Sequence, residues 1–306
     1  MRRAVPRARG ATAAHPLVRA LPLFLLAGLC LSSLDATAKY LVRDNSLFLV
    51  VWARYAGQML ITTPFAWRRA GPGFWRTRRP GLQLLRSALL LAATACFFGG
   101  LRYLPLAEGS AITFLAPIFV VLLSGPLLGE RPTPARWMAA VAGFVGILIL
   151  VRPGSAVFHP AALLLMIAAL CNALFFVLTR KLVEDSAYTT LFYSALVGTV
   201  GLSLALPWEL GTAAPLTHAA AFVLLGLFAG LGHWFVIGAF QRAPAAMLSP
   251  FAYLQILWAT SYGYVLFGQL PDHWSALGMA VIVASGLLLA LQERRDGRSA
   301  PGVSPQ

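Results

Sequence analysis

Residues 29–67 read LCLSSLDATAKYLVRDNSLFLVVWARYAGQMLITTPFAW, and residues 170–208 read LCNALFFVLTRKLVEDSAYTTLFYSALVGTVGLSLALPW. The second stretch follows the first after a shift of 141 residues. The coincident residues are Leu29/Leu170, Cys30/Cys171, Leu41/Leu182, Val42/Val183, Asp44/Asp185, Gly57/Gly198 and Trp67/Trp208. Leucine matches are common in apolar sequence, so the weight rests on the Asp, Gly and Trp pairs. The simplest explanation is a duplicated unit.

A second match supports the duplication. Residues 105–150 superpose on 244–289, with agreement at Pro105/Pro244, Ala107/Ala246, Ser110/Ser249, Gly129/Gly268 and Pro132/Pro271. Gln269 takes the place of Glu130, so the two units do not use that position alike. We therefore predict two homologous units, 20–151 and 152–291. A basic tail, 1–19, and a C-terminal tail, 292–306, flank them, and residues 1–16 and 292–306 are expected to be disordered.

The composition places both units in a membrane. Of the 306 residues, 59% are hydrophobic and 11% are charged, and the mean hydropathy is +0.75. Soluble domains carry roughly 25% charged residues. One crossing needs about 20 apolar residues, and the chain offers ten such segments: 20–42, 46–67, 81–103, 105–128, 134–151, 160–180, 187–208, 217–240, 244–268 and 273–291. We predict an all-α polytopic membrane protein with ten transmembrane helices and no soluble catalytic domain.

A unit of five spans is odd, so the second copy must enter the membrane from the opposite side. Inverted repeats of this kind are typical of secondary transporters, whose substrate sites lie near the midplane between the repeats. Pro117 in the fourth span and Pro250 in the ninth are expected to kink their helices. The small residues Ala139, Gly143, Ala142 and Gly146 of the fifth span, and Ala276, Ala280 and Ala284 of the tenth, permit close helix approach.

The basic residues indicate the orientation. Cytoplasmic loops retain Lys and Arg; with the N-terminus inside, all but six of the 24 fall on the cytoplasmic side. The two largest groups, of five arginines each, are the N-terminal tail and RRAGPGFWRTRR at 68–79. The exceptions are Arg43, Arg102 and Arg152 outside and Lys39, Arg54 and Arg86 within spans. Both termini are predicted to be cytoplasmic. The net charge of +14 then indicates membrane lipid, and not nucleic acid, as the partner of the surface. A competing interpretation takes residues 21–38 as a cleavable signal peptide.

The segment LRYLPLAEGSAITFLAPIFVVLLSGPLLGERPTPARWMAAVAGFVGILIL at 101–150 resembles the most recognisable part of the drug/metabolite transporter superfamily, EamA type. With 29–55, the resemblance covers about residues 20–291. It implies a polytopic carrier of small organic metabolites in a cell membrane, with a bacterial inner membrane expected. It does not identify the metabolite, because similar members handle amino acids, vitamins and nucleosides.

Charged residues within spans tend to face a cavity or a partner. Asp35 and Arg54 are equidistant from the turn at 43–45, roughly 14 Å below it at about 1.5 Å per residue, which predicts an ion pair near the middle of the membrane. The pair either binds a charged part of the substrate or a coupling proton, or merely locks two helices. Lys39, one turn from Asp35, competes for the carboxylate or extends toward the surface.

Further candidates for the substrate site are polar or aromatic residues within spans: Glu108, Ser110, Asn172 and Gln255 for hydrogen bonds, and Tyr55, Tyr253 and Trp258 for stacking on a flat or cationic ligand. Each of them has an alternative role in helix packing. His233 is an imidazole in a span interior and a candidate proton carrier.

The sequence contains no HExxH, GxSxG or Walker motif, so an enzyme is not expected, and neither a cofactor nor a metal is predicted. The three cysteines form no metal-binding or disulfide pattern. The prediction is a secondary transporter for a small amino-acid-like or vitamin-like metabolite, working by alternating access, with proton coupling left open. A channel or a non-transporting scaffold is the alternative, and both a monomer and a homodimer fit.

Overall fold

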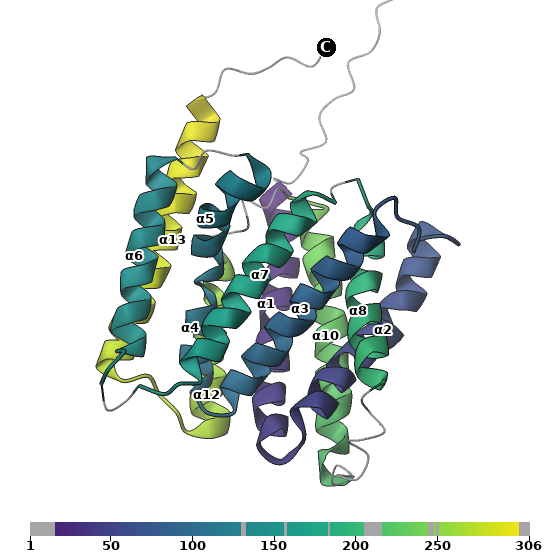
Figure 1. Ribbon diagram of the computed structural model, residues 1–306, viewed down its shortest axis with the longest axis horizontal. Helices are drawn as coiled ribbons and strands as arrows, with labels where there is room; N and C mark the ends of the chain where they lie inside the picture. The colour runs from purple at the N-terminus through teal and green to yellow at the C-terminus, as the bar shows by residue number, and fades with distance from the viewer. Residues whose placement is uncertain are drawn as a thin grey trace, which may run out of the picture.

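A computed structural model of the protein describes residues 16–129, 133–155, 158–182, 184–204, 216–243, 248 and 251–299 (Figure 1). Throughout these residues the chain is helical, with no strand. The elements are α1 (Pro16–Asp44), α2 (Leu47–Ala70), α3 (Pro80–Leu101), α4 (Leu106–Thr113), α5 (Ala116–Leu128), α6 (Pro134–Val151), α7 (Ala162–Arg180), α8 (Ala187–Ser203), the 3-10 turn η1 (Leu216–His218), α10 (Ala219–Phe240), α12 (Leu254–Phe267) and α13 (His273–Ser299).

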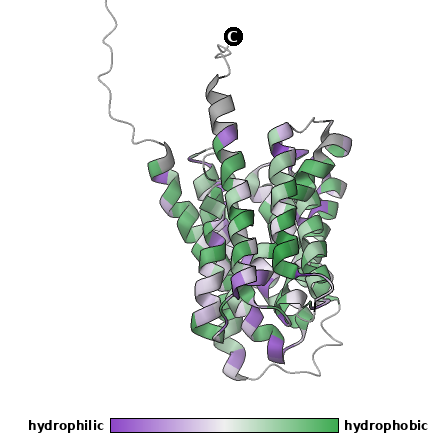
Figure 2. Cartoon of the chain, turned by 90° about the vertical axis from the view of Figure 1, so that its left-hand side faces the viewer, coloured by the Kyte–Doolittle hydropathy of each residue, from purple (hydrophilic) through white to green (hydrophobic). Residues whose placement is uncertain are grey.

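The described helices make ten passes along one bundle, because α4 and α5 share a pass, and this confirms the all-α polytopic membrane fold. Six of the passes are long and apolar enough to cross a bilayer by themselves. Large apolar side chains face outward, among them Leu60, Val223 and Val265. Figure 2 shows hydrophobic residues along the length of the helices. In water such an apolar surface would promote aggregation, whereas in a lipid bilayer it contacts the acyl chains.

The fourth predicted span is interrupted, as its proline predicts. Helix α4 ends at Thr113, Phe114 and Leu115 form a turn, and α5 begins at Ala116. Pro117 has no N–H to donate to the carbonyl of Thr113, and its ring clashes with that carbonyl. The N–H groups of Phe114 and Leu115 donate instead to Ala111 and Ile112, three residues back. The predicted kink at Pro117 is therefore confirmed. Pro250, its counterpart in the second repeat, lies outside the described residues.

The packing of the helices follows the internal repeat. Helix α1 packs on α10, and its counterpart α7 packs on α3, the counterpart of α10. Likewise α1 contacts α12, and α7 contacts α5. The counterparts α2 and α8 pack on each other, as do α6 and α13. Exchanging the two halves leaves this pattern of contacts unchanged, as expected for two repeats related by a two-fold axis.

Equivalent glycines occupy equivalent places in the two repeats. Gly129 after α5 and Gly268 after α12 have φ of 71° and 64°, a left-handed conformation that glycine adopts without strain. Gly57 of α2 backs directly onto Gly226 of α10, and Gly198 of α8 backs onto the ring of Tyr55. A side chain at Gly57, Gly198 or Gly226 would push apart helices through which the two repeats contact each other.

The loops define two sides of the bundle. The start of α1 and the end of α13 lie on one side, at the top of Figure 1, which we call the terminal side. The α2–α3 loop also lies there, and its Thr77 donates to the Asp185 carboxylate of the α7–α8 loop at 2.6 Å. On the opposite side, the far side, an ion pair of 2.8 Å joins Arg152 after α6 to Asp272 before α13.

Two expectations about extent and packing need correction. The predicted disordered tails are partly helical, since α1 begins at Pro16 and α13 continues to Ser299. Residues 291–299 contain good helix formers with charged side chains, which allow a helix to continue beyond the lipid. The stripe of Ala276, Ala280 and Ala284 is exposed, and α13 instead packs through Gly278 against Gly146 of α6. Parts of the seventh and ninth predicted spans, 205–208 and 244–247 with 249–250, lie outside the described residues.

Candidate functional site

The centre of the bundle holds a polar contact between the two repeats. Gln255, at the start of α12, donates through Nε2 to the Asp35 carboxylate of α1 at 3.4 Å. Asp35 lies nine residues before the far end of α1, about 14 Å from it at 1.5 Å per residue, and therefore near the middle of a hydrocarbon core roughly 30 Å thick. Two residues predicted as site candidates from separate repeats are thus brought together.

Arg54 of α2 lies beside this contact without joining it. The direct ion pair predicted between Asp35 and Arg54 is not formed in this conformation, and the carboxylate instead accepts from Gln255. The guanidinium lies 4.4 Å from the ring centroid of Tyr55, its Nε and Nη1 have no hydrogen-bond partner, and its charge acts on Asp35 from a longer distance. A buried arginine without a direct counter-charge is a costly arrangement, and such groups mark functional sites in membranes.

Further polar groups lie on the helices that carry the central contact and on α4, which packs against them. Ser33 and Tyr262 share a 2.6 Å hydrogen bond between α1 and α12, a second link between the repeats. Trp258 lies against Gly28 of α1, and its indole N–H has no partner. The Ser110 hydroxyl of α4 is also buried without a partner. These unused donors and acceptors are available to a ligand.

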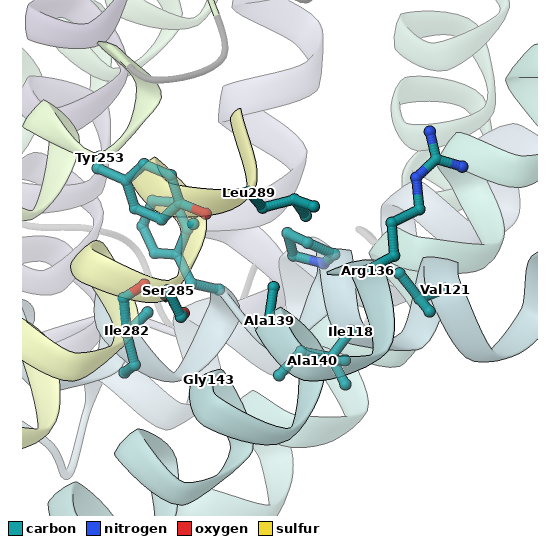
Figure 3. Close-up of a pocket in the computed structure, with 13 residues that line it drawn as sticks. Ile118, Val121, Arg136, Ala139, Ala140, Gly143, Tyr253, Ile282, Ser285 and Leu289 are labelled. Carbon is teal, nitrogen blue, oxygen red and sulfur yellow. Dashed lines mark hydrogen bonds between the residues drawn. The ribbon is translucent and has the colours of Figure 1, made fainter. Parts of the chain in front are cut away.

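Tyr253 lines a pocket beside the break between α4 and α5 (Figure 3). Its ring stacks on Phe114 at 4.9 Å, and its hydroxyl fills the space left by Gly286 on α13. The pocket, about 350 Å³ including its open mouth, extends between α5, α6 and α13 to Arg136 near the terminal side. Tyr253 is two residues from Gln255 along the chain, but neither Gln255 nor Asp35 lines the pocket.

Lys39 does not compete for Asp35. Its ammonium donates to the main-chain oxygens of Leu101 at 2.8 Å and Leu104 at 2.5 Å. The Leu101 carbonyl is the last of α3, where helical carbonyls lack partners and a cation is favourable, and Leu104 belongs to the turn that follows. The geometry therefore supports a capping role for Lys39, and its expected place in the substrate site stays a prediction without structural support.

Glu108 belongs to a polar group on the far side. Its carboxylate accepts from the Ser275 hydroxyl of α13 at 2.9 Å, which joins the repeats there. Asp272 accepts from the backbone N–H of Ser275 at 2.7 Å and pairs with Arg152. These interactions, the Ser275 backbone first, lower the pKa of Asp272. In this conformation the far side is thus tied across the repeats.

The last two sequence candidates differ in their surroundings. Tyr55 is fully buried, and its hydroxyl shares a hydrogen bond of 2.9 Å with Thr94 of α3. It packs α2 against α3 and α8 and is closed to a ligand here. Asn172 of α7 is half-buried and makes no hydrogen bond with a described residue. Neither residue contacts the Asp35–Gln255 pair.

Sequence reasoning missed Gln58 of α2. Its side chain is 0% exposed, and both of its amide atoms lack a partner. A signal was present, because Gln58 follows Arg54 by four residues and therefore shares its helix face. His233 of α10, a predicted proton carrier, accompanies this group: its Nδ1 bonds the carbonyl of Ala229 at 2.8 Å, and the charge of Arg54 acts on it.

The described residues contain no group of three His, Cys, Asp or Glu side chains placed to hold a metal. The arrangement does provide one carboxylate, one guanidinium, two amides and several aromatic rings at mid-depth. Such a set can hydrogen-bond and stack a small organic molecule.

Relatives of the chain are transporters by name. An S-adenosylmethionine uptake transporter of Rickettsia prowazekii is 27% identical over 274 residues, covering 89% of this chain and 92% of that protein. A riboflavin transporter of Rhizobium johnstonii is 31% identical over 281 residues, covering 90% and 91%. Another from Vibrio cholerae is 30% identical over 292 residues, covering 93% and 96%.

A solved crystal structure has the same fold, with a TM-score of 0.65 and 22% identity over 90% of this chain and 98% of that one. The model of the EamA-like transporter family matches residues 18–152 and again residues 159–291. These two matches include nearly all described helices, one repeat each, and the protein is a multi-pass membrane protein. The chain belongs to the EamA-like transporter family.

Proposed function

We propose that this chain is a secondary transporter that carries a small organic metabolite across the bacterial cytoplasmic membrane by alternating access. The observation that carries the proposal is the Asp35–Gln255 contact, in which each repeat contributes one polar side chain at mid-membrane depth. Rocking of one repeat against the other would break this contact and expose the carboxylate to one side or the other. The pocket beside Tyr253 supports an approach from the terminal side.

The proposed cargo is an amphipathic molecule with a flat ring. S-adenosylmethionine and riboflavin, named for two relatives, both combine a fused heteroaromatic ring with hydrogen-bonding groups. The aromatic side chains Tyr253 and Trp258 would stack on such a ring, and Asp35, Arg54 and Gln255 would bind its polar part. A cargo with both signs of charge, as in an amino acid, fits this group better than a neutral one.

Reconstitution of the purified chain into liposomes tests the proposal. We expect saturable uptake of radiolabelled S-adenosylmethionine or riboflavin, and counterflow when the unlabelled compound is trapped inside. Flux that rises linearly without saturation or counterflow would identify a channel. Absence of flux with a wide panel of metabolites, in correctly inserted protein, would favour a non-transporting scaffold.

Asp35→Asn tests the central carboxylate, with Asp44→Asn at the exposed end of α1 as the matched control. We expect Asp35→Asn to abolish net uptake and to leave membrane insertion intact. Counterflow distinguishes the two proposed roles: retained exchange without stimulation by a pH gradient indicates a coupling proton, and loss of exchange indicates cargo binding. Uptake at the wild-type rate would exclude Asp35 from the site.

We further propose that the terminal side is cytoplasmic. The exposed residues Arg68, Arg69, Arg76, Arg78 and Arg79 support this orientation. Single cysteines at Arg76 and Pro153, in a background without Cys30, Cys96 and Cys171, test it with an impermeant maleimide on intact cells. Labelling of Pro153→Cys alone is expected, and labelling of Arg76→Cys alone would reverse the orientation.

A further inference from the structure

Gln58 is a buried amide that the fold does not use. Its side chain is 0% exposed, and neither Oε1 nor Nε2 has a hydrogen-bond partner. The great majority of buried polar side chains are hydrogen-bonded, because an unsatisfied amide loses its hydration without compensation. An apolar residue of similar size would pack here at lower cost, so the amide needs another explanation.

Arg54 lies one helical turn before Gln58, on the same face of α2. Its side chain is 5% exposed, and Nε and Nη1 are unpaired. Two neighbouring positions on α2 are already committed to packing, since Gly57 meets Gly226 and Tyr55 meets Gly198. Two adjacent, enclosed and unpaired polar side chains therefore project from one turn of one helix.

The missing partner is defined by chemistry. A guanidinium supplies only donors, and the Gln58 amide supplies two donors and one acceptor. The nearby carboxylate, Asp35, accepts from Gln255 at 3.4 Å and forms no direct ion pair with Arg54. A group with oxygen acceptors and one negative charge would satisfy the donors and also balance the charge of Arg54, and a carboxylate meets both requirements.

We propose that Arg54 and Gln58 form a binding subsite for a carboxylate of the cargo. This inference rests on the proposed transport function and narrows its substrate class to metabolites that carry a carboxylate, such as amino-acid-like zwitterions. In such a cargo Asp35 would face the ammonium or another donor group. Both subsite side chains are enclosed in this conformation, so the cargo reaches them when the repeats move apart.

A variant that supplies the carboxylate itself tests the subsite without a known cargo. Gln58→Glu places a carboxylate one turn from Arg54, and we expect the melting temperature of the full-length protein to rise by about 4 °C. In an Arg54→Leu background the same change should lower it. Gln292→Glu, on an exposed part of α13, is the matched control. A lower melting temperature for Gln58→Glu with Arg54 present would overturn the subsite.

Ligand pairs test the substrate class in the same liposomes. S-adenosylmethionine and its decarboxylated form differ by the carboxylate alone, and we expect the second to compete for uptake about tenfold less well or worse. Gln58→Glu should weaken competition by S-adenosylmethionine and leave competition by the decarboxylated form unchanged. Saturable riboflavin uptake that is unaffected by Gln58→Glu would overturn this inference and leave the transport function standing. A second outcome is also possible: Gln58→Glu raises the melting temperature only when Arg54 is present, but no compound is transported. That result would overturn the transport function and leave the subsite.

Discussion

Two buried arginines on neighbouring helices of the first repeat have opposite surroundings. Arg86 of α3 is 4% exposed, and Arg54 of α2 is 5% exposed. The Nε of Arg86 donates to Thr179 at 2.7 Å, and its Nη1 donates to the Thr190 carbonyl and the Ser194 hydroxyl, both at 3.1 Å. Arg54 makes no such bond.

The difference separates architecture from function. All hydrogen-bond partners of Arg86 belong to α7 and α8, so this residue joins the first repeat to the second, and Phe175 of α7 adds a cation–π contact at 4.2 Å. A buried charge that is satisfied by the fold stabilises one conformation. A buried charge that the fold leaves unsatisfied is available to a partner that comes and goes. Four predictions test this contrast.

The largest expected effect is on transport by Arg54→Leu. Removal of the guanidinium should lower uptake by about 100-fold or more, as expected for the loss of a charged hydrogen-bonding partner of the cargo. The melting temperature should stay the same or rise, because an apolar side chain replaces an unpaired buried charge. Uptake in liposomes and thermal unfolding of the same preparation measure both. Uptake at the wild-type rate by Arg54→Leu would show that Arg54 does not bind the cargo.

Arg86→Leu, unlike Arg54→Leu, should lower thermal stability strongly. The substitution leaves Thr179, Ser194 and the Thr190 carbonyl without their donor, which costs about 3 kcal/mol or more of unfolding free energy. A large drop in melting temperature and in the yield of folded protein is the expected result. Arg78→Leu, in the exposed α2–α3 loop, serves as control. An unchanged melting temperature for Arg86→Leu would show that its hydrogen bonds do not stabilise the bundle.

Lys39→Met extends the contrast to a third buried cation. Its two bonds go to the last main-chain carbonyl of α3, at Leu101, and to that of Leu104 in the following turn, so the substitution removes a cap and keeps the apolar stem. We expect a loss of about 1–2 kcal/mol of unfolding free energy, measured by thermal unfolding. A gain in stability would place Lys39 with Arg54, among the groups that the fold leaves unsatisfied.

The smallest effect concerns the far-side ion pair and depends on pH. The pKa of Asp272 is lowered in the folded protein, so its contribution is present above the ordinary pKa near 3.9 and is lost as pH falls through the lower, folded-state value. Because the side chains of Arg152 and Asp272 are 27% and 42% exposed, the pair contributes less than about 1 kcal/mol. The difference in melting temperature between wild type and Asp272→Asn should be present at pH 7, shrink as the pH falls below ~4 and vanish once the pH is below the folded-state pKa. A difference that persists there would contradict this assignment.

Much of the fold was predictable because a chain in lipid must hydrogen-bond its own backbone, which permits few structures besides membrane-spanning helices. The apolar segments, the duplication at Asp44/Asp185 and Gly129/Gly268, and the break at Pro117 all follow from local rules. The site was predictable as a set of candidates, since a charge or an amide within an apolar span is conspicuous. The contacts between candidates were not predictable, and the expected Asp35–Arg54 pair shows why: spacing along the chain does not say which neighbouring helix a side chain faces.

By itself the amino-acid sequence predicted a ten-pass membrane bundle built from two repeats, from the length of its apolar segments and the matches between its two halves. Only the tertiary structure decided which buried charge is satisfied. Arg54, Arg86 and Lys39 look alike along the chain, and their roles depend on donors and acceptors contributed by helices up to about a hundred residues away. Hydrogen bonds act over about 3 Å, so only the packed bundle determines which partner arrives.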